Sequence, residues 1–108
     1  MQPTNFKKGV VVTMANIKES KEKFFIGDSP DESIAYIEID FKGNTLTIDS
    51  TRVDQSLQGQ GIGHQLIAYA VEYARKNNLK IIPICPYAVK QFEKHPEYHD
   101  VLGPDVFP

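Results

Sequence analysis

Apolar and polar residues alternate through the first half of the chain, a pattern typical of strands with one buried face. Within Ser33–Phe41, apolar side chains occupy one parity from residue 35 onward, and Glu38 and Asp40 fall on the other. The run Lys-Gly-Asn-Thr at 42–45 then predicts a hairpin turn. Residues 46–53 form the predicted returning strand.

Shorter elements precede this hairpin. Residues 24–26 predict a strand, and residues 18–23 predict a turn between two short strands. Asp28–Asp31 carries the turn chemistry of a loop. Residues 1–13 precede an internal methionine and show no clear period, so we expect a flexible tail there. Residues 14–108 are expected to form a single domain.

The hydrophobic period lengthens after Gly61, which predicts a helix from Gly61 to about Asn77. Asn77 and Asn78 provide its stop signal. The polar face carries charged side chains such as Glu72 and Arg75. The apolar face consists of Ile62, Leu66, Ile67, Ala70, Val71 and Ala74.

Residues 79–85 predict one more strand, and residues 86–94 predict a short helix with proline in its first turn. The run 81–84 is apolar on both parities, which predicts a strand covered on both faces. Pro83 indicates a bulge or an edge position. The order β-β-β-β-α-β-α predicts an α/β (α+β) fold with helices packed on a sheet.

Composition narrows the class of protein. The chain has 108 residues and a net charge of −2. It contains no run of basic residues, which argues against a nucleic-acid-binding surface. No apolar segment is long enough to cross a bilayer, and the first residues lack the order of a signal peptide. The single cysteine excludes an internal disulfide. We therefore expect a cytoplasmic protein with no membrane partner.

The most informative motif is the run Gln58-Gly59-Gln60-Gly61-Ile62-Gly63, directly before the long helix. Glycines permit a sharp turn and a close approach to a ligand. The unpaired N–H groups at a helix start attract an anion such as a pyrophosphate. A P-loop is excluded because His64 and Gln65 follow the last glycine, and a dinucleotide fingerprint is excluded by Leu66.

The pattern Gln-x-x-Gly-x-Gly after a strand ending in Val53 resembles the acetyl-CoA loop of the GNAT N-acetyltransferases. Together with residues 51–53, 81–87 and 95–98, it is similar to a small, single-domain, cysteine-containing family of that superfamily. The resemblance implies a trimmed GNAT fold with a mostly antiparallel sheet. The turn at 18–23 is too short for the helical segment that larger members insert after the first strand.

The resemblance also implies that acetyl-CoA or CoA is the cofactor. The glycine loop would hold the pyrophosphate through backbone N–H groups, and the strand end at Thr51 would bond the pantetheine arm. The residues implied to bind the cofactor are Thr51, Val53, Gln58, Gly59, Gln60, Gly61, Ile62, Gly63, His64 and Tyr87.

Cys85 is the candidate catalytic residue. A free cysteine often packs as a small hydrophobe. However, Cys85 ends a strand and precedes a helix start, a position that favours the reactive thiolate. The resemblance implies that this cysteine lies near the thiol of CoA. An acetyl-cysteine intermediate and a disulfide with CoA are both open roles.

One departure from the family pattern affects the general base. Members commonly have His-Thr-x-Val where this chain has Ser50-Thr51-Arg52-Val53. Ser50 is a weak base, and the sequence offers no neighbour that would activate it. His64 is expected by the phosphate loop, whereas His95 and His99 are expected on the solvated surface. No histidine and carboxylate spacing indicates a metal site.

These observations predict an acetyl-CoA-dependent N-acetyltransferase that acts on an amine of unknown identity, through Cys85 in one version of the mechanism. The alternative is a CoA-binding or thiol-redox-sensing module with little or no transferase activity. The acceptor would be a small-molecule or peptide amine. We expect a monomer or a weak dimer.

Overall fold

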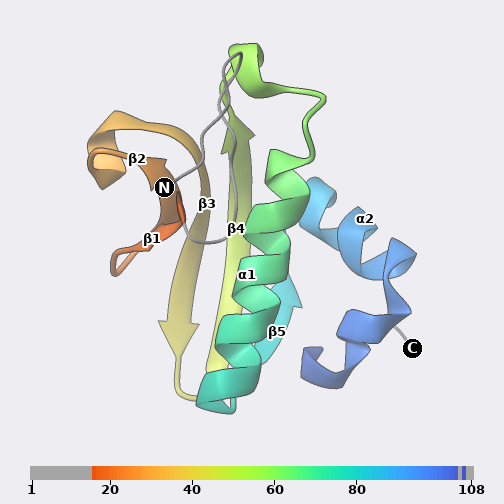
Figure 1. Cartoon of the computed structure of the whole chain (residues 1–108). Helices are drawn as coiled ribbons and strands as arrows, with labels where there is room; N and C mark the ends of the chain where they lie inside the picture. The colour runs from red at the N-terminus through yellow and green to blue at the C-terminus, as the bar shows by residue number, and fades with distance from the viewer. Residues whose placement is uncertain (1–15, 105, 107–108) are drawn as a thin grey trace.

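The computed structural model describes residues 16–104 and 106 of the 108-residue chain (Figure 1). The predicted tail, residues 1–13, lies outside this part. The strands are β1 (Lys18–Glu19), β2 (Lys23–Gly27), β3 (Ser33–Lys42), β4 (Thr45–Val53) and β5 (Lys80–Pro83). The helices are α1 (Ile62–Asn77) and α2 (Pro86–Lys94), with 3-10 turns η2 (Pro30–Glu32), η3 (Gln55–Leu57) and η4 (Pro96–Val101).

The strands form one sheet in the order β1-β2-β3-β4-β5. The first four strands are antiparallel neighbours, and β5 runs parallel to β4. Parallel strands need a crossover connection, and α1 provides it. The predicted order β-β-β-β-α-β-α and the mostly antiparallel sheet are therefore confirmed. A tight turn joins β1 to β2, with the Ser20 N–H donating to the Lys23 carbonyl at 2.8 Å.

Helix α1 lies across one face of the sheet (Figure 1). Its predicted apolar face is confirmed, since every residue of that face is at most 2% exposed. From the sheet, Ala35, Ile37 and Ile48 meet it and are fully buried. Helix α2 lies beside α1 beyond β5 and adds Ala88 and Phe92 to the same cluster. One continuous core therefore fixes both helix starts relative to β4.

The prediction that residues 81–84 are covered on both faces is wrong. Ile81 is fully buried, but Ile82 is 36% exposed and Ile84 is 56% exposed. Both helices join the core cluster that contains Ile81, and no helix of the described residues covers the opposite face. The predicted edge position of Pro83 is confirmed, because β5 is the last strand of the sheet.

The C-terminal polar segment is more ordered than its sequence suggests. Residues 96–101 form η4, which buries Tyr98 and Val101. Gly103 donates its N–H to the Ile81 carbonyl at 2.9 Å, beside a parallel bridge between Ile81 and Leu102. Leu102 and Gly103 therefore cover part of the outer edge of β5.

Candidate functional site

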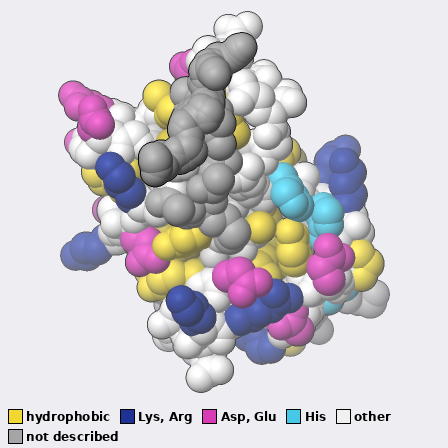
Figure 2. Space-filling view, viewed as in Figure 1, with side chains coloured by type: hydrophobic (Ala, Val, Ile, Leu, Met, Phe, Trp, Pro, Cys, Tyr) yellow, Lys and Arg dark blue, Asp and Glu magenta, His cyan; other side chains and the backbone are white. Residues whose placement is uncertain are grey.

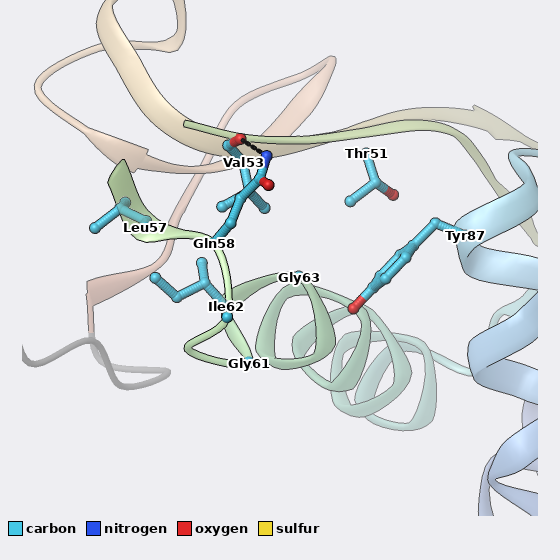
Figure 3. Close-up of a pocket in the computed structure, with 9 residues that line it drawn as sticks. Thr51, Val53, Leu57, Gln58, Gly61, Ile62, Gly63 and Tyr87 are labelled. Atoms are coloured by element: carbon cyan, nitrogen blue, oxygen red, sulfur yellow. Dashed lines mark hydrogen bonds between the residues drawn. The ribbon is translucent and has the colours of Figure 1, made fainter. Parts of the chain in front are cut away.

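Residues that are distant in the sequence meet around a cavity of about 320 Å³ (Figure 3). Strand β4, the glycine loop, the start of α1 and the start of α2 all contribute to it. The lining consists of Thr51, Val53, Leu57, Gln58, Gly59, Gly61, Ile62, Gly63 and Tyr87. Of the predicted cofactor residues, only Gln60 and His64 are missing from this lining.

The cavity exists because β4 and β5 separate. Their ladder stops at the pair Ile48 and Pro83, although β4 continues to Val53. The N–H groups of Ile84 and Cys85 both donate to the Ile48 carbonyl, at 2.9 and 3.1 Å. Beyond this point the chain turns into α2. The last residues of β4 therefore lack β5 as a neighbour.

A bulge in β4 turns the side chain of Thr51 toward the cavity. Ile39 pairs with Ile48, whereas Glu38 pairs with Ser50, so Asp49 is an extra residue. A bulge of this kind reverses the parity of the residues that follow. As a result Thr51 shares the face of Ile48. Without the bulge, its side chain would point to the opposite face of the sheet.

Beyond Ile48, no described strand pairs with the cavity-facing edge of β4. The Asp54 N–H donates to the Ile34 carbonyl of β3 at 2.7 Å. By the alternation of an antiparallel ladder, the backbone groups of Thr51 and Val53 point to the other edge. There, the Gln58 side chain donates to the Val53 carbonyl at 3.3 Å (Figure 3). Gln58 thus ties the glycine loop to the end of β4.

The glycine loop adopts a backbone that other residues rarely take. Gly59 has a φ of 85° and Gly61 has a φ of 75°, both in the left-handed region. A Cβ at either position would meet nothing within 4 Å, so conformation and not crowding demands glycine. Gly61 is the N-cap of α1 and provides no side-chain cap. The first N–H groups of α1 are therefore available to a ligand.

Gly63 and Tyr87 are in close contact across the cavity (Figure 3). A Cβ on Gly63 would lie 2.8 Å from the Tyr87 hydroxyl oxygen. Tyr87 thereby bridges the start of α2 and the first turn of α1. Burial raises the pKa of Tyr87, and negative charge on Cys85 raises it further. Tyr87 is consequently neutral at physiological pH and carries a hydrogen-bond donor.

Cys85 is 7% exposed and caps the N-terminus of α2. Its Sγ accepts from the Ala88 N–H at 3.4 Å. The same sulfur lies 3.2 Å from the Thr51 Oγ1 of β4. Cys85 packs in the core and is not among the residues that line the cavity, although its hydrogen-bond partner Thr51 is.

Ser50 has a neighbour that the sequence did not reveal. Its hydroxyl donates to the Glu38 Oε1 at 2.5 Å, so the expectation of an isolated serine is wrong. Glu38 lies between Ile37 and Ile39, which both face the core. Glu38 and Ser50 therefore share the opposite face of the sheet, away from Thr51.

The structure revises the expectation for His95, whereas the cofactor contact of His64 stays a prediction. His64 Nδ1 donates to Gln91 Oε1 at 2.8 Å, and its ring lies against that of His95, with centroids 4.8 Å apart and the planes tilted by 40°. His95 also stacks on Tyr98 and pairs with Glu97 at 3.0 Å, so it is not a freely solvated side chain. Histidine side chains accordingly gather on one face (Figure 2). His64 thus contacts α2 and η4 in the structure.

The predicted surface position of His99 is confirmed, although its Nε2 donates to the Phe92 carbonyl at 2.7 Å. Leu57 is the cavity residue that the sequence reading missed. An apolar residue in a polar loop was its only signal. Within residues 16–104, no cluster of histidine, cysteine and carboxylate side chains suits a metal ion. No helix in the described part of the chain is long and apolar enough to cross a membrane.

Comparison with known proteins agrees with this geometry. The family model described as GCN5-related N-acetyl-transferase matches residues 23–101. A GCN5-like protein from Staphylococcus aureus, solved by NMR, is 41% identical with a TM-score of 0.69, and the match covers 85% of this chain and 91% of that chain.

A second solved structure, an acetyltransferase-like protein from Agrobacterium tumefaciens, shares the fold. Its TM-score is 0.53 at 18% identity, with 85% of this chain and 82% of that chain covered. No curated protein matches the chain. The family model spans most of the chain, and the Staphylococcus aureus protein is similar over nearly its full length. The chain therefore belongs to the GCN5-related N-acetyltransferase family.

Proposed function

We propose that this protein is an acetyl-CoA-dependent N-acetyltransferase that acts on a small-molecule or peptide amine. Membership of the family supports acyl transfer in general, and the family generally uses acetyl-CoA. The observation that carries the proposal is the start of α1. A helix N-terminus without a side-chain cap opens behind two left-handed glycines, beside the cavity.

This arrangement suits the pyrophosphate of CoA. The N–H groups of the first turn have no partner within the helix, and the helix dipole favours negative charge. Gly59 and Gly61 leave open space where other residues would carry a Cβ. The anion can therefore approach the backbone closely, and no charged side chain is needed to hold it.

The free edge of β4 suits the pantetheine arm. An extended chain with amide groups can add to an exposed strand edge as an extra strand. Thr51 and Val53 direct backbone groups to that edge, and Gln58 already occupies the Val53 carbonyl. Thr51 would therefore be the main backbone partner. Tyr87, which lines the opposite side of the cavity, would donate its hydroxyl proton to a polar group of the ligand.

Cys85 would act as the nucleophile in a two-step transfer. In the first step, its sulfur bonds to the acetyl carbon of the thioester, the bond to the CoA sulfur breaks, and the Cys85 proton passes to that sulfur. In the second step, the acceptor nitrogen bonds to the acetyl carbon, the bond to Cys85 breaks, and a proton from the amine returns to Cys85. The two steps replace one acyl transfer by two easier ones.

A glycine substitution tests the cofactor site. Gly61→Val places a β-branched residue at a φ of 75° and should abolish CoA binding in calorimetry. Gly43→Val is the matched control, because Gly43 has a φ of 60° and a similarly open Cβ position in the β3–β4 turn. Each change should cost about 1–2 kcal/mol or more of folding free energy. Unchanged CoA affinity in a folded Gly61→Val protein would disprove the proposed site.

Intact mass spectrometry tests the role of Cys85. Acetyl-CoA should leave an acetyl adduct on the wild-type chain, and Cys85→Ala should bind CoA without forming it. The single cysteine makes the assignment unambiguous for a thiol-linked adduct. Turnover that survives in Cys85→Ala would instead indicate direct transfer. A reductant-sensitive CoA adduct without acetyl transfer would favour the binding or redox-sensing alternative.

A further inference from the structure

The sulfur of Cys85 lies between hydrogen-bonding groups from two different elements. The Ala88 N–H of α2 is 3.4 Å away, and the Thr51 hydroxyl oxygen of β4 is 3.2 Å away. Thr51 and Cys85 are 34 positions apart in the sequence. The contact with Thr51 therefore depends on the bulge in β4 and on the position of α2 over the sheet.

The protonation state of the sulfur decides which group donates. A neutral thiol and a hydroxyl can each donate to the other. A thiolate has no proton, so the Thr51 hydroxyl must then donate and the bond becomes charge-assisted. Such bonds are stronger than neutral ones, which means that the Thr51 hydroxyl favours the thiolate over the thiol. The Ala88 N–H acts in the same direction, as expected at a helix N-terminus.

Packing alone does not explain a threonine at this position. Valine has the same shape and would fill the same space. Among residues 16–104, the Thr51 hydroxyl has Cys85 as its only side-chain hydrogen-bond partner. Tyr87 is the titratable neighbour that interacts with the sulfur electrostatically, and it is neutral at physiological pH. Tyr87 therefore adds no negative charge beside the sulfur.

We propose that Thr51 is a positioning residue that holds the Cys85 sulfur beside the cavity and stabilises its thiolate through its hydroxyl. The role in acyl transfer rests on the function proposed above for Cys85. The stabilisation of the thiolate does not, and it is measurable with a thiol reagent in the absence of CoA.

Alkylation of the full chain by iodoacetamide across a range of pH tests this role. Cys85 is the only thiol, so the rate reports on it alone. Thr51→Val should slow alkylation near neutral pH by roughly tenfold, which is the effect of losing one hydrogen bond to a charged group. At high pH, where every thiol is ionised, the rates should converge. Thr51→Ser keeps the hydroxyl and should retain the wild-type profile.

Three outcomes separate the proposals. A Thr51→Val profile that matches wild type in a folded protein overturns the role of Thr51. Loss of CoA affinity with an unchanged profile also overturns it, because Thr51 would then be only a cofactor contact. A slowed profile in a protein that forms no acetyl adduct supports Thr51 while rejecting the proposed chemistry of Cys85. If Thr51→Val does not fold, Thr51→Ala serves with the same readout.

Discussion

At the scale of single residues, the missing side chain at Gly63 leaves room for the ring of Tyr87. The Tyr87 hydroxyl oxygen lies 2.8 Å from where a Cβ would be, so any larger residue must displace it. Gly63 itself is helical and buried. Its small size therefore serves the contact between α1 and α2, whereas the glycines before it serve the backbone of the loop.

Gly63→Ala should test whether the small size of Gly63 serves the contact with Tyr87. Alanine is the better helix former by about 0.5–1 kcal/mol. Overpacking against Tyr87 should outweigh this gain, since it typically costs about 1–3 kcal/mol. Chemical denaturation should thus show a net loss of stability. In a Tyr87→Ala background, the same change should be stabilising. An equal cost in both backgrounds would contradict the contact.

At the scale of elements, α1 has two unlike ends. Its N-cap, Gly61, provides no side-chain cap, and its C-cap, Asn78, has a φ of 56° and a ψ of 44°. The Asn78 N–H donates to the Ala74 carbonyl. The C-terminal end is therefore closed within the chain, as the Asn77 and Asn78 pair predicted, while the N-terminal end has no side-chain cap from Gly61.

Asn78→Gly should stabilise the protein by up to about 1 kcal/mol, because glycine adopts the left-handed conformation without the steric cost of a Cβ. Asn77→Gly is the matched control. Asn77 is the last residue of α1, and its Nδ2 donates to the Tyr73 carbonyl at 2.8 Å, so its replacement should destabilise. Urea denaturation of both variants measures the difference. Equal effects at 77 and 78 would argue against the left-handed cap.

At the scale of the whole molecule, Arg75 joins α1 to the C-terminal segment. It contacts Asp100 with Nη2 at 2.8 Å and Nε at 3.0 Å, and it donates to the Glu97 carbonyl at 2.7 Å. The bond to Arg75 lowers the pKa of the Asp100 carboxyl. Arg75 thereby anchors η4 to α1, and η4 in turn supports the stacked rings of Tyr98 and His95.

Asp100→Asn should lower stability at neutral pH by about 0.2–1 kcal/mol, the usual range for an exposed pair. Because folding lowers the pKa of Asp100, the ion pair contributes its full stability at pH values above the ordinary carboxyl pKa. This contribution is lost as the pH falls through the lowered pKa. The difference between Asp100→Asn and wild type in urea midpoint should therefore shrink towards pH 2. Asp28→Asn, at an exposed loop position, should change little at either pH. A constant difference across pH would contradict the ion pair.

The amino-acid sequence determined which elements form and in what order. The apolar face of each element can be read from its own residues. The alternation in residues 33–41 indicates it for a strand, and the helical period after Gly61 indicates it for α1. The glycine loop was equally legible, because left-handed backbone at Gly59 and Gly61 demands glycine wherever it occurs. These features account for the predicted order of strands and helices and for most of the cavity lining.

Only the tertiary structure decided which distant side chains meet. The bulge at Asp49 has no clear local signal, yet it turns Thr51 toward Cys85 and leaves Ser50 with Glu38 on the other face. The exposure of Ile84 likewise depends on both helices packing on one side of the sheet. Register and layer order arise from the packing of the whole core, so a pattern read along the chain does not contain them.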